Sequence, residues 1–192
     1  MAIAAIILAA GLSSRFGAAK LLQPIQGKPM LRHTVDAAIA SKAAQVIVVT
    51  GNTSPEIQTL LSGISLKTVI NSDPASGLSS SLKLGIENVG DCDGAVVLLG
   101  DMPFVQPATI DKLIDGFDPT HFQEIGMPLF RGQRGNPILW SRRFLPEIAA
   151  LEGDRGAKAL IEPHRTFLYE VEVDDPGVHI DIDTMDDLHR YE

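Results

Sequence analysis

Apolar runs alternate with amphipathic segments through the first two thirds of the chain. The first run, Ile3–Ala9 (IAAIILA), has the length of a strand and no polar position, which predicts a strand buried on both faces of a sheet. Three later runs predict further strands: residues 45–50 (QVIVVT), 66–70 (LKTVI) and 95–99 (AVVLL). Each run is followed by a glycine or a polar residue, in order Gly11, Gly51, Asn71 and Gly100-Asp101.

The segments between these runs carry apolar residues at helical spacing. Residues 29–40 (PMLRHTVDAAIA) predict a helix with Pro29 in its first turn, and helices are also expected at 55–61, 80–89 and 107–117. Alternating strands and helices predict parallel crossovers and hence a three-layer α/β/α sandwich with a Rossmann-like, mostly parallel sheet. A length of 192 residues suits one sizeable core, so we expect a single domain over residues 1–192.

The pattern becomes less regular after residue 117. Residues 124–130 and 167–173 predict strands, and 131–137 (RGQRGNP) has the composition of a turn. Short helices are expected at 141–151 and 155–161. The alternation HIDID at 179–183 predicts a last strand, which a closing helix follows from about Met185.

Composition narrows the classes of partner. Apolar residues make up 45% of the chain and charged residues 21%, as in soluble globular proteins, and the net charge of −8 disfavours nucleic acid. Cys92 is the only cysteine, which excludes an internal disulfide and a cysteine-cluster metal site. No window approaches the roughly 20 apolar residues of a membrane span. We therefore expect a cytoplasmic protein that binds small ligands, with no membrane partner.

Ligands of such folds bind at the carboxyl ends of the parallel strands. The loop after the first strand combines small residues around Gly11 with two cations, Arg15 and Lys20, and its free backbone N–H groups suit a phosphate. Its spacing matches neither GxxxxGK[ST] nor GxGxxG, which disfavours a P-loop NTPase or an NAD enzyme. The alternative is a simple glycine turn with surface cations.

Carboxylates at other strand ends suggest a metal. Asp101 closes a fully apolar strand, where an oxygen-ligated Mg²⁺ would stabilise its charge; a turn or helix-cap aspartate is the alternative. If 179–183 is a strand, His179, Asp181 and Asp183 share one face. Asp183 is then the preferred second ligand and Asp181 the other candidate, unless this acidic stretch is only a solvated edge or a helix start.

Two further groups of polar residues are candidates for substrate contacts. The turn at 71–80 could contact a nucleobase or ribose, or could be only a capped loop; its polar members are Asn71, Asp73, Gly77, Ser79 and Ser80. A second, anionic substrate could bind to Arg134, Asn136, Arg155 and Lys158. Isolated surface cations are the alternative for this second group.

Six motifs together resemble one family. They are LAAGLSSRFGAAKLL at 8–22, NSDPASGLSSSL at 71–82, GDMP at 100–103, RGNP at 134–137, GDRGAK at 153–158 and DIDTMDDL at 181–188. The sequence resembles the MobA-like nucleotidyltransferases along nearly its whole length, and is most similar to the molybdenum cofactor cytidylyltransferases among them. The opening motif marks the wider group, whereas GLSSSL, RGNP and GDRGAK point to the narrower branch.

The resemblance implies a Mg²⁺-dependent transfer of CMP from CTP to the phosphate of a molybdopterin-type acceptor, with release of pyrophosphate. It implies that Arg15, Lys20 and Asp101 are catalytic and that Asp101 and Asp183 bind the metal. The nucleotide would contact Leu8, Ala9, Ala10, Gly11, Lys20, Asp73, Gly77, Ser79 and Ser80. The acceptor would contact Arg134, Asn136 and Arg155, and a molybdoenzyme or its chaperone is a further possible partner.

Alternatives within and outside this activity stay open. Met102 stands where cytidylyltransferases of this branch often have glutamine, so GTP is a rival to CTP. A nucleotidyltransferase of the same fold that acts on a sugar phosphate is a second alternative. A non-catalytic protein that binds or delivers the molybdenum cofactor is the third.

Overall fold

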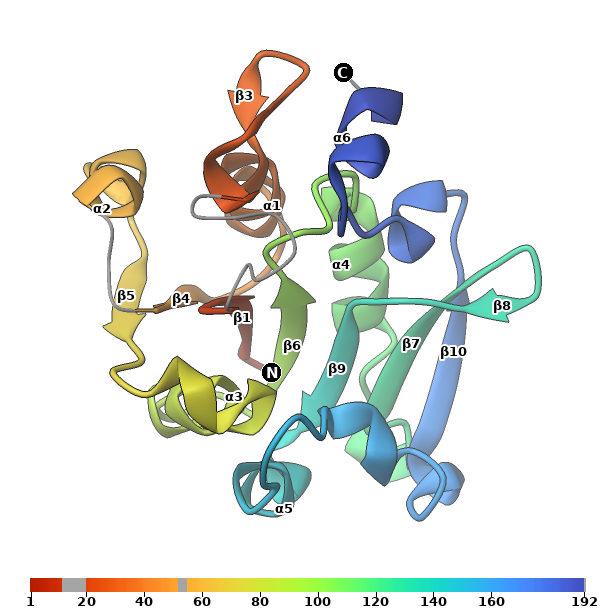
Figure 1. Ribbon diagram of the computed structural model, residues 1–192. Coiled ribbons are helices and arrows are strands. Elements are labelled where there is room, and N and C mark those ends of the chain that lie inside the picture. Colours follow the sequence, from red (N-terminus) through yellow and green to blue (C-terminus); the bar gives the residue numbers. More distant parts are fainter. Residues whose placement is uncertain (12–19, 52–54, 192) are drawn as a thin grey trace.

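The computed structural model describes residues 1–11, 20–51 and 55–191. Its strands are β1 (Ile3–Ala9), β2 (Pro24–Ile25), β3 (Lys28–Pro29), β4 (Gln45–Thr50), β5 (Lys67–Ile70), β6 (Gly94–Leu99), β7 (Ile125–Phe130), β8 (Gln133–Arg134), β9 (Ile138–Ser141) and β10 (Leu168–Glu172). The main sheet has the order β10-β7-β9-β6-β1-β4-β5, with β8 paired to β7, and β2 and β3 form a separate hairpin (Figure 1).

Strand β1 lies near the middle of the sheet. It pairs in parallel with β4 and β6, and β4 pairs in parallel with β5, so the mostly parallel sheet expected from the apolar runs is confirmed. All seven β1 residues are buried because both faces of the strand are covered. Its alternate residues enter two separate cores, Ile6 and Leu8 on one face and Ile7 and Ala9 on the other.

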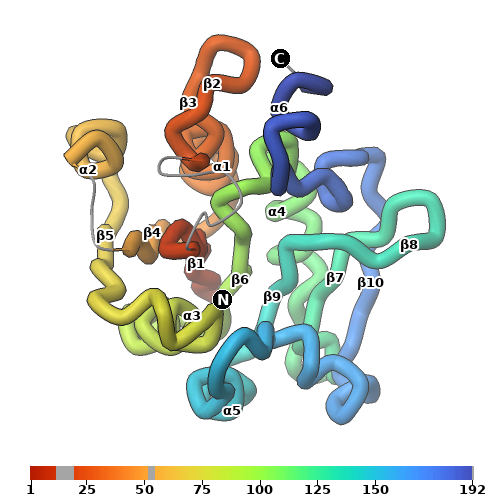
Figure 2. Tube along the Cα trace, in the orientation of Figure 1, coloured from red at the N-terminus to blue at the C-terminus, as the bar shows by residue number. Residues whose placement is uncertain are grey.

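Helices cover both faces of the sheet, which gives the three layers seen in Figures 1 and 2. Helices α1 (Met30–Ile39), α2 (Pro55–Leu61) and α4 (Pro107–Asp115) contribute to the core on one face. Helices α3 (Leu78–Glu87) and α5 (Leu145–Ala149) pack on the other face. Among the described residues, no helix is long and apolar enough to cross a membrane.

The second half of the sheet contains a strand that the sequence did not reveal. Strand β9 (Ile138–Ser141) runs antiparallel to both β6 and β7 and joins the two halves of the sheet. Its four residues, ILWS, are too few for a periodic pattern to identify. The helices expected at 141–151 and 155–161 are shorter than predicted: α5 follows a 3₁₀ turn at Arg142–Phe144, and Ala157–Leu160 is a 3₁₀ turn.

The strand predicted at 179–183 is wrong. Pro176–His179 forms a 3₁₀ turn, and the chain then continues outside any sheet to α6 (Met185–Tyr191). The alternation has another cause: Ile182 is fully buried in a small core with Ile25, Met30 and Leu188. Its backbone N–H donates to the Asp101 carbonyl over 3.0 Å, which places the segment beside the end of β6.

Candidate functional site

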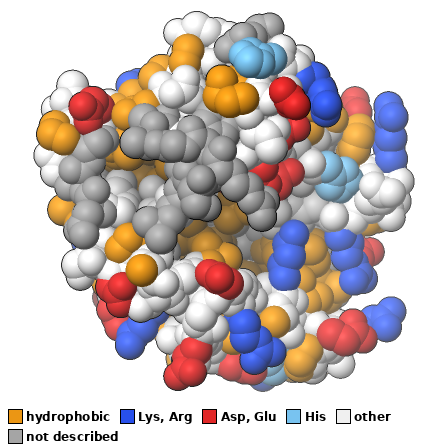
Figure 3. All heavy atoms as spheres, in the orientation of Figure 1, with side chains coloured by type: hydrophobic (Ala, Val, Ile, Leu, Met, Phe, Trp, Pro, Cys, Tyr) orange, Lys and Arg blue, Asp and Glu red, His pale blue; other side chains and the backbone are white. Residues whose placement is uncertain are grey.

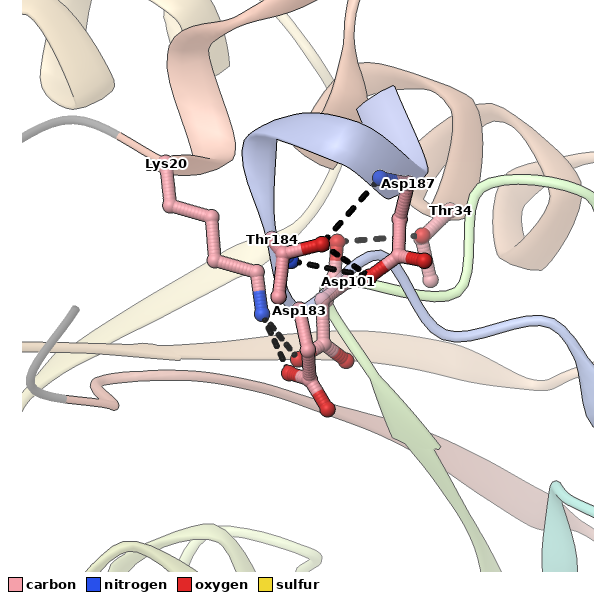
Figure 4. A network of polar contacts seen from close by, with 7 residues as sticks. Lys20, Thr34, Asp101, Asp183, Thr184 and Asp187 are labelled. Atoms are coloured by element: carbon pink, nitrogen blue, oxygen red, sulfur yellow. Dashed lines mark hydrogen bonds and ion pairs between the residues drawn. The ribbon is translucent and has the colours of Figure 1, made fainter. Parts of the chain in front are cut away.

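Three charged side chains from distant parts of the sequence meet at the carboxyl end of the sheet (Figure 4). The Lys20 ammonium nitrogen lies 2.9 Å from Oδ2 of Asp101 and 2.9 Å from Oδ1 of Asp183. The Lys20 side chain is 11% exposed, whereas those of Asp101 and Asp183 are 28% and 52% exposed. The site is therefore closed on the lysine side and accessible at the carboxylates.

Each member of this group is held by a defined element. Lys20 begins a 3₁₀ turn, Lys20–Leu22, and Asp101 lies two residues after the end of β6. Asp183 precedes Thr184, whose hydroxyl accepts from the Asp187 N–H over 3.1 Å while the Thr184 N–H donates to Asp187 Oδ2 over 3.0 Å. This reciprocal capping fixes the start of α6 and with it the position of Asp183.

The charges of the group perturb one another. Burial lowers the pKa of Lys20, but the hydrogen bond to Asp183 and the charge of Asp101 outweigh it, so the Lys20 pKa is raised above its usual 10.5. Burial raises the pKa of Asp181, and the charges of Asp183 and Asp101 act in the same direction. Lys20 is thus firmly protonated near neutral pH, and a third carboxylate stands close to the pair.

A pocket of about 540 Å³ opens beside this group. Eight of the predicted site residues line it: Leu8, Ala9, Ala10, Gly11, Lys20, Gly77, Asp101 and Asp183. The lining residues that sequence reasoning missed include Pro74, Ala75, Leu78, Ser81 and Asp154. Arg15 lies outside the described residues. A volume of this size is within the usual range for small-molecule sites.

The polar turn at 71–80 is mostly occupied by its own contacts. The buried Asn71 amide donates to the Ser80 and Ser81 hydroxyls over 2.8 and 3.0 Å, and its oxygen accepts from the Asp73 N–H over 2.9 Å. The Asp73 carboxylate accepts from the Ser76 hydroxyl. Asp73, Ser79 and Ser80 are not among the residues that line the pocket, so this turn shapes the wall through Pro74, Ala75, Gly77 and Leu78, and Ser81 lines it just beyond the turn.

A second pocket of about 350 Å³ adjoins the first, because Leu8, Leu78 and Leu99 line both. Its remaining walls are mainly apolar, with Asn136, Arg155 and Lys158 as the polar members. In the space-filling view, basic side chains border hydrophobic ones over β7 and β9 (Figure 3). Arg134 is in neither pocket and instead forms an ion pair with Glu170 of β10.

The carboxylate pair has the geometry to share a cation. Asp101 and Asp183 converge on one ammonium nitrogen at 2.9 Å, so their oxygens reach the same point in space. Within the described ranges, no group of three or more His, Cys, Asp or Glu side chains could hold a metal by itself. Mg²⁺ commonly binds through one or two carboxylates together with waters and substrate phosphates, so two carboxylates fit a metal shared with a nucleotide.

Known structures with the same arrangement of elements include Rv0371c from Mycobacterium tuberculosis H37Rv. Its crystal structure superposes with a TM-score of 0.88 at 32% identity, covering 100% of this chain and 97% of that one. The manganese complex of Rv0371c gives a TM-score of 0.84 at 30% identity, covering 100% and 98% of the two chains. The chain is thus similar over its whole length to a protein that has been crystallised with a divalent metal.

Curated relatives extend the comparison. The bifunctional protein GlmU of Rhizorhabdus wittichii is 36% identical over 115 residues, which are 58% of this chain and 25% of GlmU. This match spans about a quarter of the length of that relative. Nicotine blue oxidoreductase of Paenarthrobacter nicotinovorans is 22% identical over 191 residues, covering 96% and 94% of the two chains. The model of the MobA-like NTP transferase domain matches residues 5–167, and the chain belongs to this nucleotidyltransferase family.

Proposed function

We propose that the chain is a Mg²⁺-dependent cytidylyltransferase that transfers CMP from CTP to the phosphate of a molybdopterin-type acceptor. The observation that supports it best is the Lys20 ammonium held between Asp101 and Asp183 at 2.9 Å, at the edge of a pocket of about 540 Å³. Family membership supports nucleotidyl transfer in general. The choice of CTP and of the acceptor rests on the sequence motifs.

The proposed reaction asks mainly for positioning and neutralisation of charge. Lys20 would donate to the triphosphate, and Asp101 and Asp183 would hold Mg²⁺. Bound there, Mg²⁺ would neutralise phosphate oxygens and orient the leaving pyrophosphate. An oxygen of the acceptor phosphate would form a bond to the α-phosphorus while the bond between that phosphorus and the bridging oxygen to the β-phosphate breaks. Arg15 is assigned to the phosphates from the cationic loop in the sequence and from the family resemblance.

The second pocket is a suitable place for the acceptor. It shares a wall with the nucleotide pocket, and Arg155, Lys158 and Asn136 could hold a phosphate at its rim. The rest of its lining is mainly apolar, with Val97, Ile138 and Trp140 among its members. Such walls leave few partners for the hydroxyl groups of a sugar and suit a flat heterocycle better, because each unpaired hydroxyl loses a hydrogen bond to water.

Sugar-phosphate nucleotidyl transfer is the second candidate. The 36% identity to GlmU over 115 residues favours it. The two candidates differ only in the acceptor, and therefore share the proposed roles of Lys20, Asp101 and Asp183.

Pyrophosphate release tests both candidates in one experiment. Each of the four NTPs is incubated with the protein and Mg²⁺, with molybdopterin, with a hexosamine 1-phosphate, or with no acceptor. The proposal expects release that requires molybdopterin and is fastest with CTP. Turnover with the sugar phosphate alone would establish the second candidate, and cofactor binding without release from any NTP would indicate a delivery protein. The cytoplasmic location of the protein stays a prediction from the sequence.

A further inference from the structure

Besides Asp101 and Asp183, a further aspartate, Asp154, lines the nucleotide pocket at a position away from the Lys20 group. Asp154 lines the pocket from the loop that precedes the 3₁₀ turn at Ala157–Leu160. Lys20 begins the 3₁₀ turn that contacts α1, and Asp183 lies two residues before α6. Gly77 directly precedes α3, and α3 covers the face of the sheet opposite α1 (Figure 1). Asp154 lies beside Gly77, and its carboxylate therefore belongs to the end of the pocket away from the proposed phosphate site.

The contact with Gly77 holds Asp154 in place. The Ser79 N–H donates to the Gly153 carbonyl over 3.1 Å, which joins the Asp154 loop to the start of α3. A Cβ atom on Gly77 would lie 2.5 Å from the Gly153 carbonyl carbon and 2.7 Å from Asp154 Oδ1. Gly77 also has a φ of +91°, which favours glycine. The absence of a side chain at position 77 thus lets the Asp154 carboxylate lie directly on the pocket wall.

The Asp154 carboxylate has hydrogen-bonding capacity to offer a ligand. Within the part of the chain that the structure describes, neither a hydrogen bond nor an ion pair engages it, whereas Asp101 is paired with Lys20. The polar side chains of the neighbouring turn are already engaged, since Asn71 binds the hydroxyls of Ser80 and Ser81. Asp154 is therefore the side chain best able to accept a hydrogen bond at this end of the pocket.

Electrostatics decides which part of a nucleotide can face this carboxylate. A triphosphate oxygen would be repelled, so a carboxylate without a cation suits a group that donates a hydrogen bond. Cytosine N4 is such a donor, and guanine and adenine also carry amino groups. Where cytosine carries its N4 amino group, uracil and thymine carry the O4 carbonyl oxygen, and this oxygen would repel a carboxylate.

We propose that Asp154 determines base specificity by accepting a hydrogen bond from the exocyclic amino group of the nucleobase. The inference rests on the proposed nucleotidyl transfer and deepens it: the nucleotide is one with an amino-bearing base, and UTP and TTP are discriminated against. Asp154 lies in the GDRGAK motif, and no role was assigned to it from that motif.

Exchange of the carboxylate for an amide tests the inference. In Asp154→Asn the side chain keeps its shape but gains an N–H that can donate to O4 of uracil. The ratio of kcat/KM for CTP to that for UTP is expected to fall about tenfold or more, as for a lost hydrogen bond to a charged group. Glu152→Gln, an exposed residue two positions earlier that lines neither pocket, is the matched control and should leave the ratio unchanged.

The outcomes separate this inference from the proposed function. If the wild type binds and turns over no NTP, the proposed function fails. If the wild type uses CTP but Asp154→Asn and Asp154→Ala keep the wild-type preference, the assignment of Asp154 is wrong while the function stands. A wild type that uses UTP as well as CTP also overturns the inference. Thermal unfolding of each variant, followed in parallel, shows whether a lost activity reflects lost folding.

Discussion

Replacing Lys20 with methionine removes the ammonium from the carboxylate pair and keeps a side chain of similar length. The ammonium nitrogen is 2.9 Å from Asp101 Oδ2 and 2.9 Å from Asp183 Oδ1. The Asp183 side chain is 52% exposed and that of Asp101 only 28%, so the two contacts contribute unequally to the free energy of unfolding.

The expected loss can be worked out contact by contact. A hydrogen bond to a charged group contributes about 1.5–3 kcal/mol, which applies to the less exposed Asp101 contact. An exposed ion pair contributes about 0–1 kcal/mol, which applies to Asp183. Lys20→Met should therefore lower the free energy of unfolding by about 1.5–4 kcal/mol. Because the Lys20 pKa is raised, this contribution is complete below pH 10.5 and disappears as the pH rises through the folded-state pKa.

Urea denaturation at pH 7, with and without added Mg²⁺, measures both stability and metal binding. Without Mg²⁺, Lys20→Met should show the loss just given. Mg²⁺ should stabilise the variant more than the wild type, because the ion no longer competes with the ammonium for the two carboxylates. Lys28→Met is the control: its ammonium lies 2.6 Å from Asp36 Oδ2, but its side chain is 45% exposed.

Two results would refute this reasoning. An unfolding free energy of Lys20→Met equal to that of the wild type would mean that the pair contributes nothing to stability. A response to Mg²⁺ no larger than that of the wild type would mean that the two carboxylates are not the metal site.

Two further predictions concern the stability of two loops. Asp175 is buried and accepts hydrogen bonds from the Gln106 N–H, the Thr109 hydroxyl and the Gly177 N–H. Asp175→Ala should therefore lower the free energy of unfolding in urea by about 3 kcal/mol or more. Asp174 is the exposed neighbour, and Asp174→Ala should change that free energy by about zero. Gly77→Ala combines a φ of +91° with a 2.5 Å clash against Gly153, and Gly90→Ala combines a φ of +66° with open space. The Gly77 variant should therefore lose more stability than the Gly90 variant, by about 1 kcal/mol or more; equal losses would contradict the close contact with Gly153.

The fold of the first half was predictable because its signals are local. The seven apolar residues of β1 and the runs at β4 and β6 are long enough to mark buried strands. The second half depends on contacts between distant residues. Strand β9 is four residues long and takes its identity from pairing with β6 and β7. The alternation around Ile182 mimicked a strand, although it reflects a side chain buried against Ile25 and Leu188.

The candidate site shows the same division. The strand-end rule pointed to Asp101, which lies just beyond the end of β6, and Asp183 was chosen from the acidic stretch before α6, although the strand expected there does not form. Their approach to one ammonium depends on the hydrogen bond from the Ile182 N–H to the Asp101 carbonyl, which no spacing encodes. Asp154 had no local signal beyond its motif, because an aspartate next to a glycine in an exposed loop is typical of a turn. Only its contact with Gly77 places it in the pocket.

Transfer of label from CTP tests the central claim most directly. The protein is incubated with [α-³²P]CTP, Mg²⁺ and molybdopterin. Labelled product is counted, and the unlabelled pyrophosphate is measured enzymatically, for the wild type, Asp101→Asn and Asp186→Asn. Asp186 is an exposed aspartate in the first turn of α6 that lines neither pocket, so its variant is the control. We predict labelled product and equimolar pyrophosphate from the wild type and the control, and at least about 100-fold less from Asp101→Asn. Equal transfer by Asp101→Asn would contradict the assigned site, and no transfer by the wild type would contradict the proposed reaction.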